Sequence, residues 1–159
     1  MPLKAVFFDV GETLVDEQRW WRELAERAGL QPHVVWAALG VTIERAEEHD
    51  ALWAHLGSEK PGGWWHGLVY SYADFYADAV PCLEAVRGLG LRVGIAGNQT
   101  EALEGWAHAL RLPADVIVSS ASLGIRKPDP RFFERLVELA EATPEDVSYV
   151  GDRVDNDVL

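Results

Sequence analysis

The sequence predicts an α/β protein with a Rossmann-like, doubly wound parallel sheet and an inserted α-helical segment. The run Ala5–Phe8 is continuously apolar and rich in β-forming residues, as in a strand that is covered on both faces. After Pro81, strand and helix patterns alternate, which is typical of a parallel sheet flanked by helices. Between these two regions the pattern changes to amphipathic helices separated by Gly and Pro.

The elements of the sheet follow in chain order. The first strand ends at Asp9, and Gly11 breaks its pattern. After Pro81 we expect helices over residues 82–89, 101–110 and 130–142, and strands over residues 91–96, 116–119 and 147–150. A doubly wound sheet ordinarily continues beyond such a strand, so we expect the C-terminal part of the sheet to be missing.

The inserted segment is predicted to be entirely helical. Its helical patterns cover residues 17–29, 32–40, 42–57 and 62–76. Six tryptophans lie in it, and most of them are expected to form its core because aromatic side chains bury large areas. These residues are Trp20, Trp21, Trp36, Trp53, Trp64 and Trp65.

Composition and charge exclude several classes of protein. The chain has 159 residues, of which 48% are hydrophobic and 25% charged, as in a soluble globular protein. Its net charge of -12 argues against nucleic acid or an anionic membrane as the main partner. No apolar stretch approaches the roughly 20 residues of a membrane span, and Asp9 interrupts the first apolar run. With Cys82 as its single cysteine, the chain is predicted to be cytoplasmic.

Polar residues follow the predicted strands at the points where they end. Asp9 follows the first strand, Asn98 the second, and Asp152 and Asp157 the last, while Lys127 lies in the loop "GIRKPDP". The carboxyl ends of parallel strands meet at one edge of a sheet, so these side chains should gather there. Carboxylate oxygens around an open position suit Mg²⁺, and a lysine beside a helix N-terminus suits a phosphate.

Four segments in this order resemble the motifs of the haloacid dehalogenase-like hydrolase superfamily: "FFDVGETLVD", "GIAGN", "GIRKPDPRFF" and "YVGDRVDND". The resemblance covers essentially the whole chain and implies an α/β core of residues 1–15 and 80–159 with an α-helical cap of residues 16–79. It implies that Asp9 is the nucleophile, that the Gly11 carbonyl and Asp152 hold Mg²⁺, and that Asp157 supports the metal.

The same resemblance implies how a small phosphorylated substrate is held. Lys127 would hold both the nucleophile and the phosphate, while Gly97, Asn98 and nearby amides would bind phosphate oxygens. Trp64 and Trp65 are the insert residues that we expect to close over the substrate. A homodimer could form through the exposed sheet edge or through the cap.

Two positions depart from the phosphatase pattern. Gly11 stands where those relatives have a second Asp that protonates the leaving oxygen and later activates water. General acid/base catalysis contributes roughly 10²- to 10⁴-fold, so esters with poor leaving groups should react slowly unless Glu12 or another group substitutes. Alternatively, Gly11 could be needed for a positive φ. Gly97 replaces the usual Ser or Thr, which leaves Asn98, backbone amides and Thr100 to bind phosphate.

These departures keep three other functions open. Haloacid dehalogenases also lack the second Asp, but they need no metal, and the acid-rich "GDRVDND" argues for one. Phosphonoacetaldehyde hydrolases have a small residue there but need a cap lysine, and Lys60 is the only lysine of the insert. A catalytically weakened binding or regulatory protein would also fit Gly11 and Gly97. Asp155 is predicted to be a solvated loop residue, because three acids in six positions cannot all face one ion.

Overall fold

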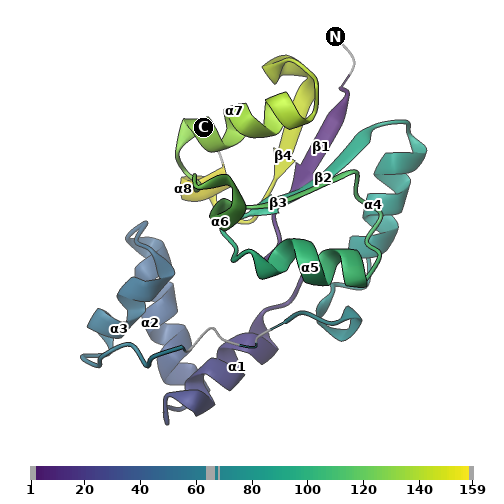
Figure 1. Ribbon diagram of the computed structural model, residues 1–159. Coiled ribbons are helices and arrows are strands. Elements are labelled where there is room, and N and C mark those ends of the chain that lie inside the picture. Colours follow the sequence, from purple (N-terminus) through teal and green to yellow (C-terminus); the bar gives the residue numbers. More distant parts are fainter. Residues whose placement is uncertain (1–2, 64–66, 68, 158–159) are drawn as a thin grey trace. The chain divides into compact units, whose positions relative to one another are not determined.

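A computed structural model describes residues 3–63, 67 and 69–157 (Figure 1). The chain divides into two compact units, which are treated separately below. The first, called the sheet unit, consists of residues 1–16 and 69–159, and the second, called the helical unit, consists of residues 17–68. In the described part of the chain, no helix is both long and apolar enough to cross a membrane.

The sheet unit contains four parallel strands in the order β3-β2-β1-β4. Their bounds are β1 (Ala5–Phe8), β2 (Arg92–Gly97), β3 (Val116–Ser119) and β4 (Val147–Val150). Phe8, at the end of β1, is in register with Ile95 of β2 and with Val150 of β4. The predicted parallel sheet is therefore confirmed, and the carboxyl ends of β1, β2 and β4 meet at one edge.

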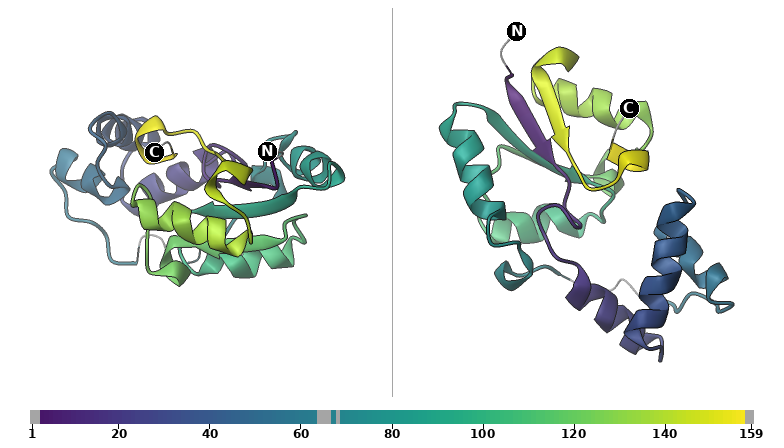
Figure 2. Two further views of the ribbon diagram at one scale, coloured as in Figure 1. Left: turned by 90° about the horizontal axis from the view of Figure 1, so that it is seen from above. Right: turned by 180° about the vertical axis from the view of Figure 1, so that it is seen from behind.

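Helices connect the strands of the sheet unit. Their bounds are α4 (Ala79–Gly88), α5 (Ala102–Ala109), α6 (Ser120–Leu123), α7 (Pro130–Leu139) and α8 (Val154–Asp157). In all the views, the strands lie between α4 and α7 (Figures 1 and 2). The predicted helices correspond to α4, α5 and α7, and the short α6 and α8 are additions. Two short 3₁₀ turns, Tyr72–Asp74 and Pro144–Asp146, complete the unit.

The core of the sheet unit forms because the central strands are buried on both faces. On one face, Phe7 of β1 packs with Phe132 and Leu136 of α7, which carries its apolar residues along one stripe. On the other face, Val93 and Ile95 of β2 have no exposed surface. Continuous burial of this kind explains why β1 is apolar at every position instead of at alternate ones.

The chain passes twice between the two units, and these passes pair with each other inside the sheet unit. Val15 bridges Phe75 in an antiparallel sense. The Asp16 N–H donates to the Asp74 carbonyl at 2.8 Å, and the Tyr76 N–H donates to the Leu14 carbonyl at 3.1 Å. Both ends of the inserted segment are thereby attached to the sheet unit by one pair of extended segments.

The helical unit contains α1 (Gln18–Arg27), α2 (Pro32–Glu44), a 3₁₀ turn at His49–Ala51 and α3 (Leu52–His55). Trp20, Trp21 and Trp53 are each less than a tenth exposed and form its interior, as predicted, whereas Trp36 is 36% exposed. Trp21 makes an edge-on ring contact with His49, 5.7 Å between centroids. Trp64 and Trp65 lie outside the described residues.

Two of the helix predictions for the insert are wrong. The pattern 42–57 was expected to be one helix, but α2 continues through Gly40 and ends near Ala46, which has φ 53°. The helix tolerates Gly40 because packing of its buried face outweighs a propensity cost of about 1 kcal/mol. Over the described part of 62–76, the chain forms only the 3₁₀ turn Tyr72–Asp74, since Phe75 pairs as an extended segment with Val15.

The contact between Gly94 and Phe7 predicts a stability difference between two glycine substitutions. A Cβ on Gly94 would lie 2.1 Å from the Phe7 ring, so Gly94→Ala should lower the free energy of unfolding by about 1–3 kcal/mol. The matched control is Gly105, which is exposed within α5 and has no atom near its Cβ position. Gly105→Ala should raise the free energy of unfolding by about 0.5–1 kcal/mol. Urea denaturation measures both, and equal effects would refute the packing argument.

Candidate active site

Asp9 lies at the carboxyl end of β1, where the strand turns away from the sheet. Its N–H donates to the Val150 carbonyl of β4 at 2.8 Å, which fixes its backbone between two strands. The chain then forms a tight turn, in which the Val10 carbonyl accepts hydrogen bonds from Leu14 at 2.9 Å and Val15 at 3.1 Å. Asp9 is only 9% exposed, so its carboxylate needs a charged or hydrogen-bonding partner.

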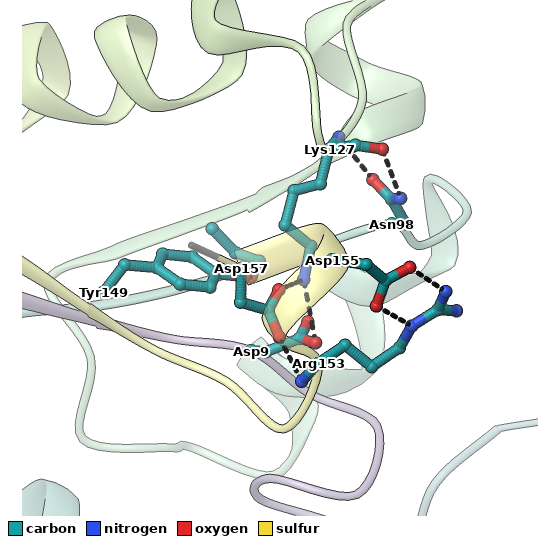
Figure 3. A network of polar contacts seen from close by, with 8 residues as sticks. Asp9, Asn98, Lys127, Tyr149, Arg153, Asp155 and Asp157 are labelled. Atoms are coloured by element: carbon teal, nitrogen blue, oxygen red, sulfur yellow. Dashed lines mark hydrogen bonds and ion pairs between the residues drawn. The ribbon is translucent and has the colours of Figure 1, made fainter. Parts of the chain in front are cut away.

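Lys127 supplies that partner (Figure 3). Its Nζ lies 2.8 Å from Asp9 Oδ2 and also contacts Asp157 Oδ1. Lys127 is 1% exposed, which places its ammonium group among the most buried polar groups of the described chain. One buried cation therefore joins carboxylates from β1 and from α8, although 148 positions separate the two aspartates along the sequence, from Asp9 to Asp157.

Asp157 is held from both sides. Its second oxygen, Oδ2, accepts the Arg153 N–H at 2.9 Å, which closes the short helix α8 around the carboxylate. Gly151 makes this approach possible, because a Cβ at that position would lie 2.1 Å from Asp157 Oδ2. Asp152, which follows Gly151, is more exposed than Asp157. The predicted motif after β4 thus delivers two carboxylates to the same edge of the sheet.

Asp9, Asp152 and Asp157 form a cluster that fits a divalent cation. One ligand oxygen from each lies within 4.8 Å of the others. Burial raises the pKa of Asp9 despite the opposing effect of Lys127, and loss of hydration, followed by the charge of Asp9, raises the pKa of Asp152 to about 6. Three carboxylates and one ammonium leave an excess of negative charge, and hard oxygen ligands in this number suit Mg²⁺.

Tyr149 lies beneath the ammonium group and was not expected at the site. The centroid of its ring is 5.1 Å from Lys127 Nζ, and its hydroxyl donates to the Ala96 carbonyl at 2.7 Å. Burial, together with the negative charges of Asp9 and Asp157, keeps the Tyr149 pKa far above its ordinary value. Tyr149 is therefore a neutral ring that contacts the lysine by its π-face, a stabilising arrangement for a buried cation.

Gly97 ends β2 and Asn98 follows it, as predicted. A Cβ on Gly97 would lie 2.3 Å from Asp9 Oδ1, so the glycine admits the Asp9 carboxylate against the strand. Asn98 Oδ1 accepts the Lys127 N–H at 2.8 Å, and Asn98 Nδ2 donates to the Lys127 carbonyl at 2.9 Å. Both polar atoms of the Asn98 side chain thus contact the Lys127 backbone.

The turn after Asp9 shows whether Gly11 is needed for a positive φ. Gly11 is not among the glycines with positive φ; in this turn the positive φ, 51°, belongs to Glu12. The Glu12 carboxylate accepts a hydrogen bond from the Tyr76 hydroxyl at 2.7 Å, and this bond raises the Tyr76 pKa. The backbone explanation for Gly11 is therefore wrong.

The structure brings together the predicted residues Asp9, Asp152, Asp157 and Lys127, with Asn98 behind Lys127. Asp155 is not part of the cluster, as expected, but it lies in α8 instead of a loop and forms a two-point ion pair with Arg153, with Nη2 at 2.5 Å and Nε at 3.1 Å (Figure 3). Sequence patterns missed Tyr149 and Tyr76. The alternation of β4 places Tyr149 on the same face as Val147, which was the only available signal for it.

Comparisons with known proteins show which family the chain resembles. A family model described as haloacid dehalogenase-like hydrolase matches residues 3–159. Glyceraldehyde 3-phosphate phosphatase from Methanopyrus kandleri is 26% identical over 187 residues, covering 98% of this chain and 78% of that protein. Haloacid dehalogenase-like hydrolase domain-containing protein 3 from Homo sapiens is 36% identical over 141 residues, 85% of this chain and 48% of that protein. The crystal structure of a HAD phosphatase from Thermococcus onnurineus superposes with a TM-score of 0.61 at 20% identity, covering 98% of this chain and 80% of that one.

Because Lys127 is buried, its substitution should lower the stability of the protein strongly. Lys127→Met keeps most of the apolar stem but leaves Asp9 and Asp157 without their cation, so the free energy of unfolding should fall by about 3–5 kcal/mol. Lys60, whose Nζ lies 2.5 Å from Asp50 with the side chains 44% and 50% exposed, is the matched control. Lys60→Met should cost less than about 1 kcal/mol. Denaturation with a chelator present measures both, and similar losses would show that burial of the pair has no energetic consequence.

Proposed function

Because the chain belongs to the haloacid dehalogenase-like hydrolase family, we propose that it is a Mg²⁺-dependent phosphatase of small phosphorylated metabolites. The observation that carries this proposal is the buried Lys127 between Asp9 and Asp157, with Asp152 beside them. Relatives named as glyceraldehyde 3-phosphate phosphatases support the phosphatase activity and a small substrate. The proposed location is the cytoplasm.

In the proposed reaction, Asp9 is the nucleophile. One of its carboxylate oxygens attacks phosphorus, an Asp9–phosphorus bond forms, and the bond from phosphorus to the leaving oxygen breaks. Water then attacks the phosphorus of the aspartyl-phosphate, which releases inorganic phosphate and restores the carboxylate. Lys127, which forms an ion pair with Oδ2 of Asp9, orients the carboxylate and offsets negative charge as phosphate approaches.

The metal-holding groups in this proposal are Asp9, Asp152 and the Gly11 carbonyl, with Asp157 supporting them. When bound, Mg²⁺ supplies positive charge that neutralises and orients the phosphoryl group. Asp157 acts through its neighbours, since one of its oxygens contacts Lys127 and the other accepts the Arg153 N–H. The segment at Gly97 and Asn98 is where phosphate oxygens would lie. The Gln99 N–H is already used, because it donates to the Gly97 carbonyl at 2.9 Å.

The helical insert is proposed to be the cap of this enzyme, over residues 16–79, with a core of residues 1–15 and 80–159. Support comes from the paired segments around Val15 and Phe75, which attach the insert at a single place. A cap on such a connection can open and close, exclude water and set specificity. Trp64 and Trp65 remain proposed substrate contacts within it, and a homodimer through a sheet edge or the cap remains part of the proposal.

The proposed enzyme has no acidic side chain at position 11 to protonate the leaving group. Gly11 cannot donate a proton, and the carboxylate of the next residue, Glu12, already accepts a hydrogen bond from Tyr76. Substrates whose leaving group departs without a proton should therefore be preferred. The absence of an acid at position 11 also fits a haloacid dehalogenase, which is the second candidate function. The activity of a dehalogenase would not depend on Mg²⁺, whereas the three-carboxylate cluster supports the metal-dependent phosphatase.

The identity of the nucleophile and the metal is tested with three substitutions. Asp9→Asn should abolish turnover of p-nitrophenyl phosphate, because the amide does not attack phosphorus. Asp152→Asn should weaken the stimulation by Mg²⁺. Asp155→Asn is the control, since Asp155 pairs with Arg153 outside the cluster, and it should retain activity. Steady-state rates of each variant are measured with Mg²⁺ and with chelator. Activity that survives in Asp9→Asn would show that Asp9 is not the nucleophile.

The absence of an acid at position 11 predicts a steep dependence on the leaving group. Aryl and acyl phosphates should be hydrolysed far faster than alkyl phosphates by the natural chain. Gly11→Asp should raise alkyl-phosphate turnover by up to about 10²- to 10⁴-fold, the range of a positioned acid or base. The thermal stability of the variant is measured alongside its kinetics. A stable variant without gain, together with a natural chain equally active on both classes, would mean that another residue supplies the proton.

A further inference from the structure

The end of β2 and the Lys127 loop are joined by hydrogen bonds at two places. At one, the Asn98 side chain forms two bonds with Lys127, accepting its N–H at 2.8 Å and donating to its carbonyl at 2.9 Å. At the other, the Gln99 carbonyl accepts from the Ala121 N–H at 3.3 Å and from Ser120 Oγ at 3.2 Å. Two adjacent residues after β2 thus hold both ends of the segment from α6 to Lys127.

Helix α6, where this segment begins, is itself fixed. Glu104 Oε1 of α5 accepts bonds from the Ser119 N–H at 2.7 Å, Ser119 Oγ at 2.9 Å and Ser122 Oγ at 2.6 Å. Burial disfavours the Glu104 charge, but these bonds outweigh burial and lower its pKa. With its first end fixed in this way, the segment packs Ile125 against the core, and the side chain of Asn98 holds its second end at the Lys127 backbone.

We infer that Asn98 is a positioning residue for Lys127: its side chain fixes the Lys127 backbone so that the ammonium lies between Asp9 and Asp157. The inference rests on the proposed function and assigns Asn98 a role other than phosphate ligand. A lysine has a long, flexible stem, so placing its Nζ 2.8 Å from Asp9 requires a backbone that does not move. The two bonds from Asn98 fix the Lys127 backbone at both its N–H and its carbonyl and so supply that constraint.

A double-mutant cycle separates positioning from direct phosphate binding. Asn98→Ala should lower kcat for p-nitrophenyl phosphate by about 10- to 100-fold, the scale of a misplacement near 1 Å. In a Lys127→Met background the same change should cost less than about twofold, because its effect passes through Lys127. An equal cost in both backgrounds would show that Asn98 acts on phosphate directly and would overturn the inference.

A matched control excludes a general loss of stability. Asp115 Oδ2 accepts the Val93 N–H at 2.9 Å, so it attaches a polar side chain to the opposite end of β2. Asp115→Ala should lower the thermal midpoint by an amount comparable with Asn98→Ala while kcat stays within twofold. A similar fall of kcat in Asp115→Ala would mean that the effect of Asn98 is merely structural.

Amide hydrogen exchange tests the contact without relying on activity. The Lys127 N–H should be protected in the natural chain and in Asn98→Asp, whose carboxylate can still accept it, and should lose protection in Asn98→Ala. Retained protection in Asn98→Ala would overturn the inference. If the natural chain shows no phosphatase activity with Mg²⁺, the proposed function fails, whereas the exchange result still decides whether Asn98 holds Lys127.

Discussion

The ion pairs of Lys127 with Asp9 and Asp157 are the constraint on which the site depends. Carboxylates at the ends of β1 and α8 would repel each other in a region where burial disfavours charge. A single ammonium, 1% exposed, contacts both of them, and the Tyr149 ring lies against it. The sheet topology makes this possible, because β1 pairs directly with β4 and so brings the first and the last motifs of the chain together.

Close packing around these carboxylates explains where glycine stands in the motifs. A Cβ on Gly97 would lie 2.3 Å from Asp9 Oδ1, and a Cβ on Gly151 would lie 2.1 Å from Asp157 Oδ2. Each glycine therefore allows a carboxylate to approach a strand end that a larger residue would block. Position 97 therefore offers no side-chain hydroxyl group, and the lack of a Cβ there leaves room for the Asp9 carboxylate.

Much of the fold and the site could be predicted because both depend on patterns that are local in sequence. Val116–Ser119 and Val147–Val150 were predicted at their observed bounds, since short runs rich in valine and other β-forming residues, between turns, are typical of strands. Residues 42–57 were not, because the continuation of α2 past Gly40 is decided by packing. The contacts of Tyr149 and of the Asn98 side chain were not predicted either, since they depend on strand register and on loop geometry, which no local sequence pattern encodes.

The turn after Asp9 contains a residue in an unfavourable backbone conformation, which contacts with Tyr76 help to stabilise. A left-handed conformation costs a residue with a Cβ roughly 1–2 kcal/mol, and here Glu12, with φ 51°, adopts it instead of Gly11. Its carboxylate accepts the Tyr76 hydroxyl at 2.7 Å, and the Tyr76 N–H donates to the Leu14 carbonyl at 3.1 Å. Tyr76 therefore contacts the turn by both side chain and backbone, and these bonds offset the conformational cost. Because Tyr76 lies on the chain pass that returns from the insert, a movement of that pass would act on the turn that carries Gly11, two residues from the Asp9 carboxylate.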